Sequence, residues 1–526
     1  MNKFKNISML LLVIAVPMII YLYFLQWKTT TMYGDDLYMY KAHAALNTFS
    51  EKINLPGSFQ KYRPVHGFSM HFLIEIFQKN VNGYYCFNIA IQVINSFLFA
   101  LILNLFLKSV SLSLIAGLTI GLSRFSFFNI TQLYNGGALE GLAITFFLAF
   151  LFYIIKAIQF DNDSAHKQSD IIKAILFANL SMYTHERYIV LLPFIVLLIL
   201  IYPGLKMLSR KQKSILSLIA IASVCLNIFL KKEVYNLPFF VGTGGKTMSL
   251  SSSTPVSFFI DGLLSILGLN EGPDYLVGIN FHSLKFFNQL LVTVLLIGFS
   301  VTFFIYFRKI IKSNFSTQEK QTGVLWIIPF LALLFVLLLV PAVLTIRLEQ
   351  RWLQASYSIF ILCFIIAFCH LPFKNNYSRN SAFFLFIILL LWSDFTYLHK
   401  GAGNIYMTNA EKIANRFEEA IDKGVIKPGT KNIYLWEKQK DINTENEIKW
   451  TLAEDYFFYF YQQQEKKLIF ADSIYKKDNP YSNSFINFNK NTDQIIYMDR
   501  AITDITNDYL QDSLKAFSNR IHNLPN

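Results

Sequence analysis

The chain has 526 residues, of which 54% are hydrophobic and only 15% are charged. Together with a mean hydropathy of +0.39, this composition excludes an ordinary soluble protein and favours a membrane protein. The formal net charge of +13 would by itself suit a protein that binds nucleic acid or anionic lipid, so the positions of the basic residues decide what it means.

Apolar stretches long enough for a helix to cross a bilayer recur along most of the chain. The first one follows Lys3 and Lys5, but it ends in bulky residues and lacks a small-residue cleavage site, so we interpret it as an anchor and not as a signal peptide. We expect about eleven spanning helices, at residues 7–25, 86–107, 109–128, 138–158, 171–184, 188–203, 214–230, 286–307, 323–345, 353–372 and 381–398.

Basic residues concentrate in every second connection between the predicted helices. The positive-inside rule places these connections and the N-terminus in the cytoplasm, and the C-terminal domain outside. The basic connections carry Lys108, Lys156 and Lys167, Lys206 to Lys213, Arg308 to Lys320, and Lys374 with Arg379. The segments that would face the outer side are 26–85, 129–137, 185–187, 231–285 and 346–352.

The first outer loop, residues 26–85, holds two adjacent carboxylates in the sequence YGDDLYMYK. Asp35 and Asp36 open a helical pattern, and Pro64 stands where the first turn of a second short helix would begin. Asp35 could simply cap the first helix, but that explains one acid and not two. Because adjacent carboxylates repel each other, one of the pair is suited to act as a general base, and we predict Asp35 and Asp36 as catalytic residues.

The sequence HER at 185–187 interrupts an apolar run that extends from 171 to 203. The stretch before it provides about fourteen residues of helix, or roughly 21 Å, which is less than the hydrocarbon thickness. We therefore predict that His185, Glu186 and Arg187 lie below the outer surface, where ionisable residues usually mark a functional site. The alternative is a Glu–Arg pair that satisfies itself at the membrane interface.

The outer loop 231–285 contains the glycine-rich sequence GTGGKT. A phosphate-binding Walker motif would need a glycine where Phe240 stands and a strand before it, so we exclude nucleotide binding. Lys246 could instead close over an anionic substrate, and the apolar stretch VSFFIDGLLSILGL is expected to lie in the interface or to re-enter.

Two further arginines, Arg347 and Arg351, follow the ninth predicted span in the sequence TIRLEQRW. The planar guanidinium suits phosphate oxygens, so these residues could hold a lipid phosphate at the outer surface. Snorkelling to the interface is the alternative explanation.

From residue 399 to 526 the composition changes toward Asn, Lys, Asp, Glu and Tyr, which indicates a small soluble domain. Thr408 with Glu411 predicts a capping box before a helix. Short β-like runs follow at NIYLW, KLIFA and QIIYM, with helical patterns near 450–463 and 504–518. The predicted fold class is an α-helical multi-pass membrane domain, residues 1–398, followed by a small α/β domain.

Four motifs together, GDD at 34–36, YRP at 62–64, HER at 185–187 and EQRW at 349–352, resemble the GT-C class of membrane glycosyltransferases. This class, which includes protein mannosyltransferases and aminoarabinose transferases, takes sugars from polyprenyl-phosphate carriers. The resemblance implies an inverting transfer of a hexose or pentose to a glycan, lipid or protein acceptor at the outer face of a cell membrane, with no nucleic acid partner.

The resemblance also implies a role for each candidate residue. Asp35 would act as general base on the acceptor hydroxyl, and Asp36 would tune it. Arg347 and Arg351, with help from Arg63 or Lys246, would neutralise the departing phosphate. The HER motif, residues 185–187, would position the acceptor or the sugar. No set of residues has the spacing of a metal cage, so we predict no cofactor, with a divalent ion as the alternative.

Two other classes of protein fit part of this pattern. A glycan polymerase fed by lipid diphosphate would be chemically close, and a flippase for a lipid-linked glycan would use similar buried charges along a path. A transporter is expected to have paired repeats and spans broken near the midplane. Here the polar residues collect at the outer ends of the predicted helices, which favours an enzyme that works on one side.

Overall fold

In a computed structural model of the chain, the described part comprises residues 14–19, 30–46, 61–160, 163–237, 253–270, 279–312, 324–344, 349–401, 406–437, 442–470, 488–489 and 491–507. The chain divides into two compact units. The first consists of Met1–Lys28 and Asn47–Ile405, and the second consists of Thr29–Leu46 and Tyr406–Asn526.

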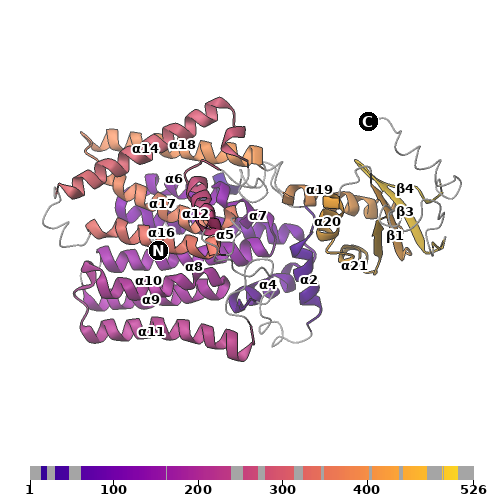
Figure 1. The fold of residues 1–526 in the computed structure, drawn as a ribbon, viewed down its shortest axis with the longest axis horizontal. Helices are drawn as coiled ribbons and strands as arrows, with labels where there is room; N and C mark the ends of the chain where they lie inside the picture. Colours follow the sequence, from indigo (N-terminus) through magenta and orange to yellow (C-terminus); the bar gives the residue numbers. More distant parts are fainter. Residues whose placement is uncertain are drawn as a thin grey trace, which may run out of the picture. The chain divides into compact units, whose positions relative to one another are not determined.

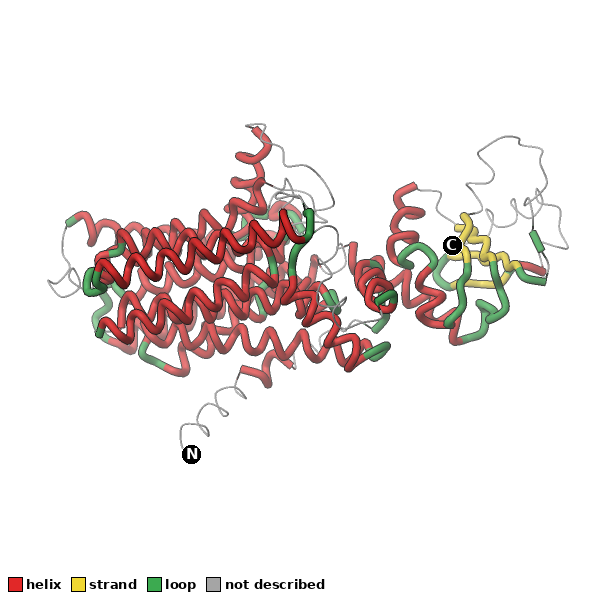
Figure 2. Tube along the Cα trace, turned by 90° about the horizontal axis from the view of Figure 1, so that it is seen from below, coloured by secondary structure: helices red, strands yellow, loops and turns green. Residues whose placement is uncertain are grey.

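The first unit is built from long apolar helices that lie side by side (Figure 1, Figure 2). Some of these helices begin with a side-chain cap. Asn80 accepts a hydrogen bond from the backbone of Gly83 at the start of α5, and Ser209 with Gln212 forms a capping box at the start of α11. The helices are α4 (Pro64–Phe77), α5 (Val81–Leu107), α6 (Val110–Gly121), α7 (Phe127–Thr131), α8 (Leu142–Ile155), α9 (Ser164–Thr184), α10 (Leu191–Ile201), α11 (Arg210–Phe229), α12 (Ser253–Ile266), α14 (Phe286–Ile311), α16 (Val324–Leu344), α17 (Gln350–Cys369) and α18 (Asn376–Gly401).

Within the described residues, six helices are long and apolar enough to cross a membrane, and α6 continues after a 50° bend into a seventh candidate. This confirms the predicted class, a multi-pass helical membrane protein. Helices occupy the positions of the predicted spans from the second onward, and residues 14–19 of the first predicted span are also helical. The number of helices that cross the membrane stays a prediction.

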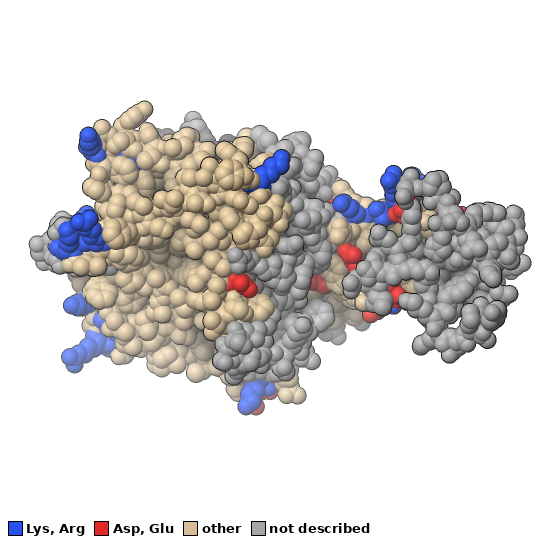
Figure 3. Space-filling model, turned by 45° about the horizontal axis from the view of Figure 1, so that its top comes forward, with Lys and Arg blue, Asp and Glu red and all other residues tan. Residues whose placement is uncertain are grey.

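Helices α8 and α17 form the centre of the unit. Their apolar stretches are 67% and 89% buried, whereas the corresponding stretches of α11 and α14 are only 22% and 33% buried. The exposed apolar side chains of α14, such as Phe304 and Ile297, would be costly in water and suit contact with lipid. On the face shown in Figure 3, lysine and arginine gather mostly at one end of these helices.

The apolar stretch after the GTGGKT loop forms helix α12 (Ser253–Ile266), which is too short to span a membrane. Its location in the interface or as a re-entrant segment stays a prediction. Arg124 lies against the end of this helix and donates a hydrogen bond to the carbonyl of Ser265. The charge of Arg124 complements the negative end of the helix dipole.

The second unit contains a four-stranded sheet in the order β2-β1-β3-β4. Strand β1 pairs in parallel with β2 and β3, and β4 pairs with β3 in antiparallel orientation. This confirms the small α/β domain and the three strands predicted from the sequence, to which the structure adds β4. The strands are β1 (Asn432–Glu437), β2 (Lys467–Phe470), β3 (Asp493–Met498) and β4 (Ile502–Asp504), and the helices are α2 (Asp35–Ala44), α19 (Tyr406–Asp422), α20 (Ile442–Thr451) and α21 (Tyr456–Gln462).

Two details of the second unit differ from expectation. Helix α19 begins at Tyr406, so Thr408 lies inside the helix, and the predicted capping box is wrong. The carboxylate of Glu411 instead accepts a hydrogen bond from the backbone N–H of Thr30, at 3.0 Å. Residues 29–46, which we expected in the first outer loop of a domain ending at 398, belong to the same compact unit as α19. The helix predicted near 504–518 lies largely outside the described residues.

Candidate functional site

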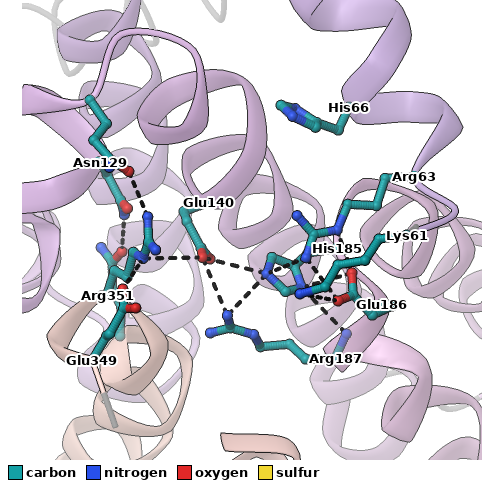
Figure 4. A network of polar contacts seen from close by, with 12 residues as sticks. Lys61, Arg63, His66, Asn129, Glu140, His185, Glu186, Arg187, Glu349 and Arg351 are labelled. Atoms are coloured by element: carbon teal, nitrogen blue, oxygen red, sulfur yellow. Dashed lines mark hydrogen bonds and ion pairs between the residues drawn. The ribbon is translucent and has the colours of Figure 1, made fainter. Parts of the chain in front are cut away.

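Charged side chains from four separate segments of the first unit meet in one group, which we call the charged cluster (Figure 4). The segments are the residues before α4, a π-helix (Asn135–Gly141) before α8, the break between α9 and α10, and the start of α17. The charged cluster consists of Lys61, Arg63, Glu140, His185, Glu186, Arg187, Glu349 and Arg351.

Glu140 is the anchor at the centre of the charged cluster, and it is only 1% exposed. Its Oε1 atom lies 3.3 Å from Arg187 Nη2, 3.5 Å from His185 Nε2 and 3.8 Å from Arg351 Nε. The π-helix that carries Glu140 is a rare local geometry that often occurs at functional sites. A Cβ at Gly137 within it would lie 1.9 Å from Asn88 Oδ1, so only glycine allows this close packing against α5.

A second carboxylate, Glu186, joins the break between α9 and α10 to the residues before α4. Arg63 donates two hydrogen bonds to it, one of them 2.8 Å long, and Lys61 Nζ lies 3.4 Å from its Oε1. Burial alone would raise the pKa of Glu186, but Arg63, His185 and Lys61 outweigh burial and hold that pKa well below its usual value. Glu186 is therefore a charged partner for Arg63.

His185 lies between these two carboxylates. Its Nε2 is 3.0 Å from Arg187 Nη2, and its Nδ1 is 3.5 Å from Glu186 Oε2. Burial, followed by the charges of Arg187 and Arg63, lowers the pKa of His185 to about 3, so the imidazole is neutral near pH 7. A neutral imidazole at this place can donate one hydrogen bond and accept another without adding charge to the cluster.

The arginines of the charged cluster are held in fixed orientations. Arg351 contacts Glu349 Oε2 at 2.5 Å and donates to Gln132 Oε1 at 2.5 Å. The guanidinium of Arg187 stacks over the ring of Trp352, 4.5 Å from its centroid. Such pre-arranged guanidinium groups lose little freedom when they bind an oxyanion.

The charged cluster has more positive than negative groups. Lys61, Arg63, Arg187 and Arg351 supply four cations against three carboxylates, with His185 neutral. The pKa of Lys61 is lowered to about 8, mainly by burial and then by the crowded positive charge of Arg63. An anion such as a phosphate would relieve this crowding.

Five of the predicted substrate-binding residues thus come together: Arg63, His185, Glu186, Arg187 and Arg351. The first four of these belong to two segments, the residues before α4 and the break between α9 and α10. The local sequence does not predict that these two segments are in contact. The predictions for Lys246 and Arg347 lie outside the described residues.

The predicted catalytic pair belongs to the second unit. Gly34, with a φ of +55°, precedes α2, so Asp35 is the first residue of the helix and not its N-cap. Asp35 Oδ1 accepts a hydrogen bond of 3.2 Å from Trp450 Nε1, while Asp36 is 2% exposed. The backbone N–H of Gly34 also donates to the carbonyl of Thr451, at 2.8 Å. The GDD sequence is therefore hydrogen-bonded to α20 at Trp450 and Thr451.

Glu140, the residue that joins three of the segments, was not among the predicted site residues. Its signal was available, because Glu140 is an acid within an apolar stretch that we predicted to span, and such residues usually mark a site. The same signal applies to a buried pair elsewhere in this unit, Arg124 and Asp394, whose Nε and Oδ1 atoms lie 3.9 Å apart. Tyr357 donates to this aspartate at 3.1 Å.

Within the described residues, no group of three or more histidine, cysteine, aspartate and glutamate side chains could hold a metal ion. The expectation that the chain uses no metal remains a prediction.

No protein-family model matches the chain, and no curated protein matches it. Among solved structures it is similar to the oligosaccharyltransferase AglB from Archaeoglobus fulgidus, with 12% identity and a TM-score of 0.47, over 94% of this chain and 69% of that chain. It is also similar to ArnT from Cupriavidus metallidurans, with 11% identity and a TM-score of 0.34, over 87% and 85%. Both belong to the GT-C class that the sequence motifs resemble.

Proposed function

We propose that the protein is an inverting glycosyltransferase that moves a sugar from a polyprenyl-phosphate carrier to an acceptor on the outer side of the membrane. The observation that carries this proposal is the convergence of Arg187 and Arg351 on the buried carboxylate of Glu140. Held by one anchor, these two guanidinium groups form a cationic site within an apolar helical unit, which suits a phosphate attached to a lipid chain.

The proposed role of the arginines follows from where negative charge develops during sugar transfer. The acceptor hydroxyl oxygen attacks the anomeric carbon, and the bond between that carbon and the phosphate oxygen of the carrier breaks. The leaving phosphate gains negative charge as the bond breaks, so fixed arginine donors stabilise the transition state more than the ground state. Arg351 is the foremost donor in this proposal, and Arg187 and Arg63 are further donors of the charged cluster.

Glu140 is a poor candidate for the base that takes the acceptor proton. Two guanidinium groups and an imidazole share its carboxylate, and a proton on it would break this arrangement. In line with the resemblance, we assign the general base to Asp35 and a tuning role to Asp36. The hydrogen bond from Trp450 holds the Asp35 carboxylate in one orientation.

The proposed outer location rests on the ends of the helices. Glu140 precedes α8, residues 185–187 follow α9, and Arg351 lies in the first turn of α17. The basic connections follow the C-terminal ends of α5, α8, α10 and α14. If the basic ends face the cytoplasm, the charged cluster faces outward.

The test is transfer of radiolabelled sugar from a panel of polyprenyl-phosphate sugars by the purified full-length protein. Undecaprenyl phosphate, which is bound in a second ArnT structure similar to this chain (10% identity, TM-score 0.31, over 94% of this chain and 93% of that chain), is a practical carrier for the panel. Wild type is compared with Asp35→Asn and Asp36→Asn, and we expect transfer to survive in Asp36→Asn and to vanish in Asp35→Asn.

Transfer from no donor by a folded protein would contradict the proposal. Activity with lipid diphosphate donors would then indicate a glycan polymerase. Movement of a labelled lipid-linked glycan across vesicles, without transfer, would indicate a flippase.

A further inference from the structure

A second histidine lies beside the charged cluster and takes no part in its ion pairs. His66, in the first turn of α4, is 1% exposed. Its Nδ1 lies 3.3 Å from the carbonyl oxygen of Ala138, in the π-helix that carries Glu140. The ring points from α4 toward that π-helix (Figure 4). His66 is therefore fixed to the same segment as the anchor of the charged cluster.

The contact with Ala138 decides which nitrogen of His66 carries the proton. A carbonyl oxygen can only accept, so Nδ1 must donate. Burial, followed by the charge of Arg63, lowers the pKa of His66 to about 3, so the ring is neutral and holds a single proton. Nε2 is consequently an unprotonated acceptor with a free lone pair.

This lone pair has no hydrogen-bond partner among the described residues. A buried acceptor without a donor is unfavourable, and an unsatisfied polar atom in a folded protein requires an explanation. The electrostatic neighbours of the ring are Arg63, Glu140 and His71, of which the first two belong to the charged cluster. A ligand bound at the charged cluster could supply the missing donor.

We propose that Nε2 of His66 accepts a hydrogen bond from a hydroxyl group of the sugar on the lipid-phosphate donor. This inference rests on the proposed function, since it requires that a sugar phosphate binds at the charged cluster. The site then combines two kinds of recognition. Guanidinium groups take the phosphate oxygens, and a neutral acceptor takes a sugar hydroxyl.

Such an acceptor makes the site selective for the sugar and not for the lipid. A site built to pair with a substrate hydroxyl rejects an analogue that lacks it, because the acceptor is then left unpaired in the complex. Bare carrier phosphate, which has no sugar, gains nothing from His66. His66 is therefore a specificity residue for the donor sugar.

The test is equilibrium binding of two probes to purified full-length protein in detergent. One probe is undecaprenyl phosphate, and the other is the undecaprenyl-phosphoryl sugar that wild type binds most tightly among glucose, galactose, mannose and arabinose derivatives. The variants are His66→Phe, which keeps the ring shape without the nitrogens, and His66→Gln, which can offer an acceptor near the position of Nε2. Ser69→Ala is the matched control, because the Ser69 hydroxyl on the same helix donates to its own helix backbone at Val65.

We expect His66→Phe to weaken binding of the glycosylated carrier about tenfold and to leave undecaprenyl phosphate unchanged. His66→Gln should recover part of the loss, and Ser69→Ala should bind both probes as wild type does. Removal of one particular sugar hydroxyl should weaken binding to wild type about tenfold. The same deoxygenated sugar should bind His66→Phe no more weakly than the complete sugar does. Unchanged binding of undecaprenyl phosphate also shows that the variants are folded.

Equal affinity of wild type and His66→Phe for the glycosylated carrier would overturn this inference and leave the proposed function intact. The inference also fails if His66→Phe weakens both probes alike, since the residue would then support the whole site. Failure of wild type to bind either probe would overturn the proposed function together with the inference.

Discussion

Arg187 Nη2 and Glu140 Oε1 lie 3.3 Å apart, both almost completely shielded from solvent. The same carboxylate oxygen is approached by Arg351, which also pairs with Glu349, so Glu140 helps to compensate two guanidinium groups that come from different segments. Removing one member of a buried ion pair leaves an uncompensated charge and costs far more than losing an exposed pair. This asymmetry makes Glu140 the most sensitive position of the charged cluster.

Glu140→Gln keeps the size of the side chain and removes only its charge. It should lower the free energy of unfolding by about 3 kcal/mol, because the buried arginines then lack a compensating carboxylate. The measurement is the thermal midpoint of the purified protein in detergent. Glu419→Gln is the control, since Glu419 is 60% exposed and pairs with Lys423 on the surface of α19, where ion pairs contribute little. A midpoint that falls equally in both variants, or in neither, would show that Glu140 is not an anchor.

Two substitutions of Arg351 should separate the contribution of the guanidinium shape from that of its charge in binding a lipid phosphate. Arg351→Lys keeps the charge but loses the planar fork, and we expect about tenfold weaker binding of undecaprenyl phosphate. Arg351→Gln removes both and should weaken binding by up to about a hundredfold. Arg210→Gln is the control, because Arg210 is an exposed residue at the start of α11. A similar loss in the control would indicate a general effect of surface charge.

The helices of the first unit were predictable because their signal is local. A run of apolar residues specifies α14 whatever the rest of the chain does, and the short run before His185 gave the break after α9. The charged cluster was predictable only as a set of candidates. Which arginine meets which carboxylate depends on segments far apart in the sequence, so the central place of Glu140 came from the structure.

Tertiary contacts also explain the wrong capping box and the placement of the GDD sequence. Glu411 has the spacing of a capping residue, but its carboxylate is used by the backbone of Thr30. Similarly, Gly34 follows a predicted membrane anchor in the sequence yet pairs with Thr451. Local patterns contain no information about partners that arrive from another part of the chain.

Gly34 should tolerate no side chain, for two separable reasons. Its φ of +55° strains any L-residue, and a Cβ would lie 2.6 Å from a ring carbon of Trp450. Gly424 has a φ of +69° and nothing within 4 Å of its would-be Cβ, so Gly424→Ala tests the backbone strain alone. We expect Gly34→Ala to lose about 1–3 kcal/mol more stability than Gly424→Ala, through overpacking against the indole.

The comparison of the two alanine variants is made by thermal unfolding, followed by intrinsic tryptophan fluorescence. Gly34→Ala should also reduce sugar transfer if Asp35 is the base, because the indole that orients its carboxylate must shift. Equal midpoints for the two variants would refute the steric part of the prediction.

Glu411 should make α19 less stable as the pH rises. Burial raises the pKa of this carboxyl from 4.5 to about 7, although the Thr30 N–H acts in the opposite direction. The folded state therefore binds a proton more tightly than the unfolded state between these two pH values, and its free energy of unfolding falls as the pH rises through this window. Burial raises the pKa of Glu418 on the same helix as well, which adds to the same trend.

Glu411→Gln removes this titration and should flatten the pH dependence of the local stability of α19. The measurement is hydrogen exchange of the α19 amides by mass spectrometry, with wild type and variant compared at matched pH so that the intrinsic exchange rate cancels. Wild type should lose protection relative to Glu411→Gln as the pH approaches about 7, while Glu419→Gln should follow wild type. A constant difference between wild type and Glu411→Gln across the window would mean that Glu411 is already charged in the folded protein at the lower pH.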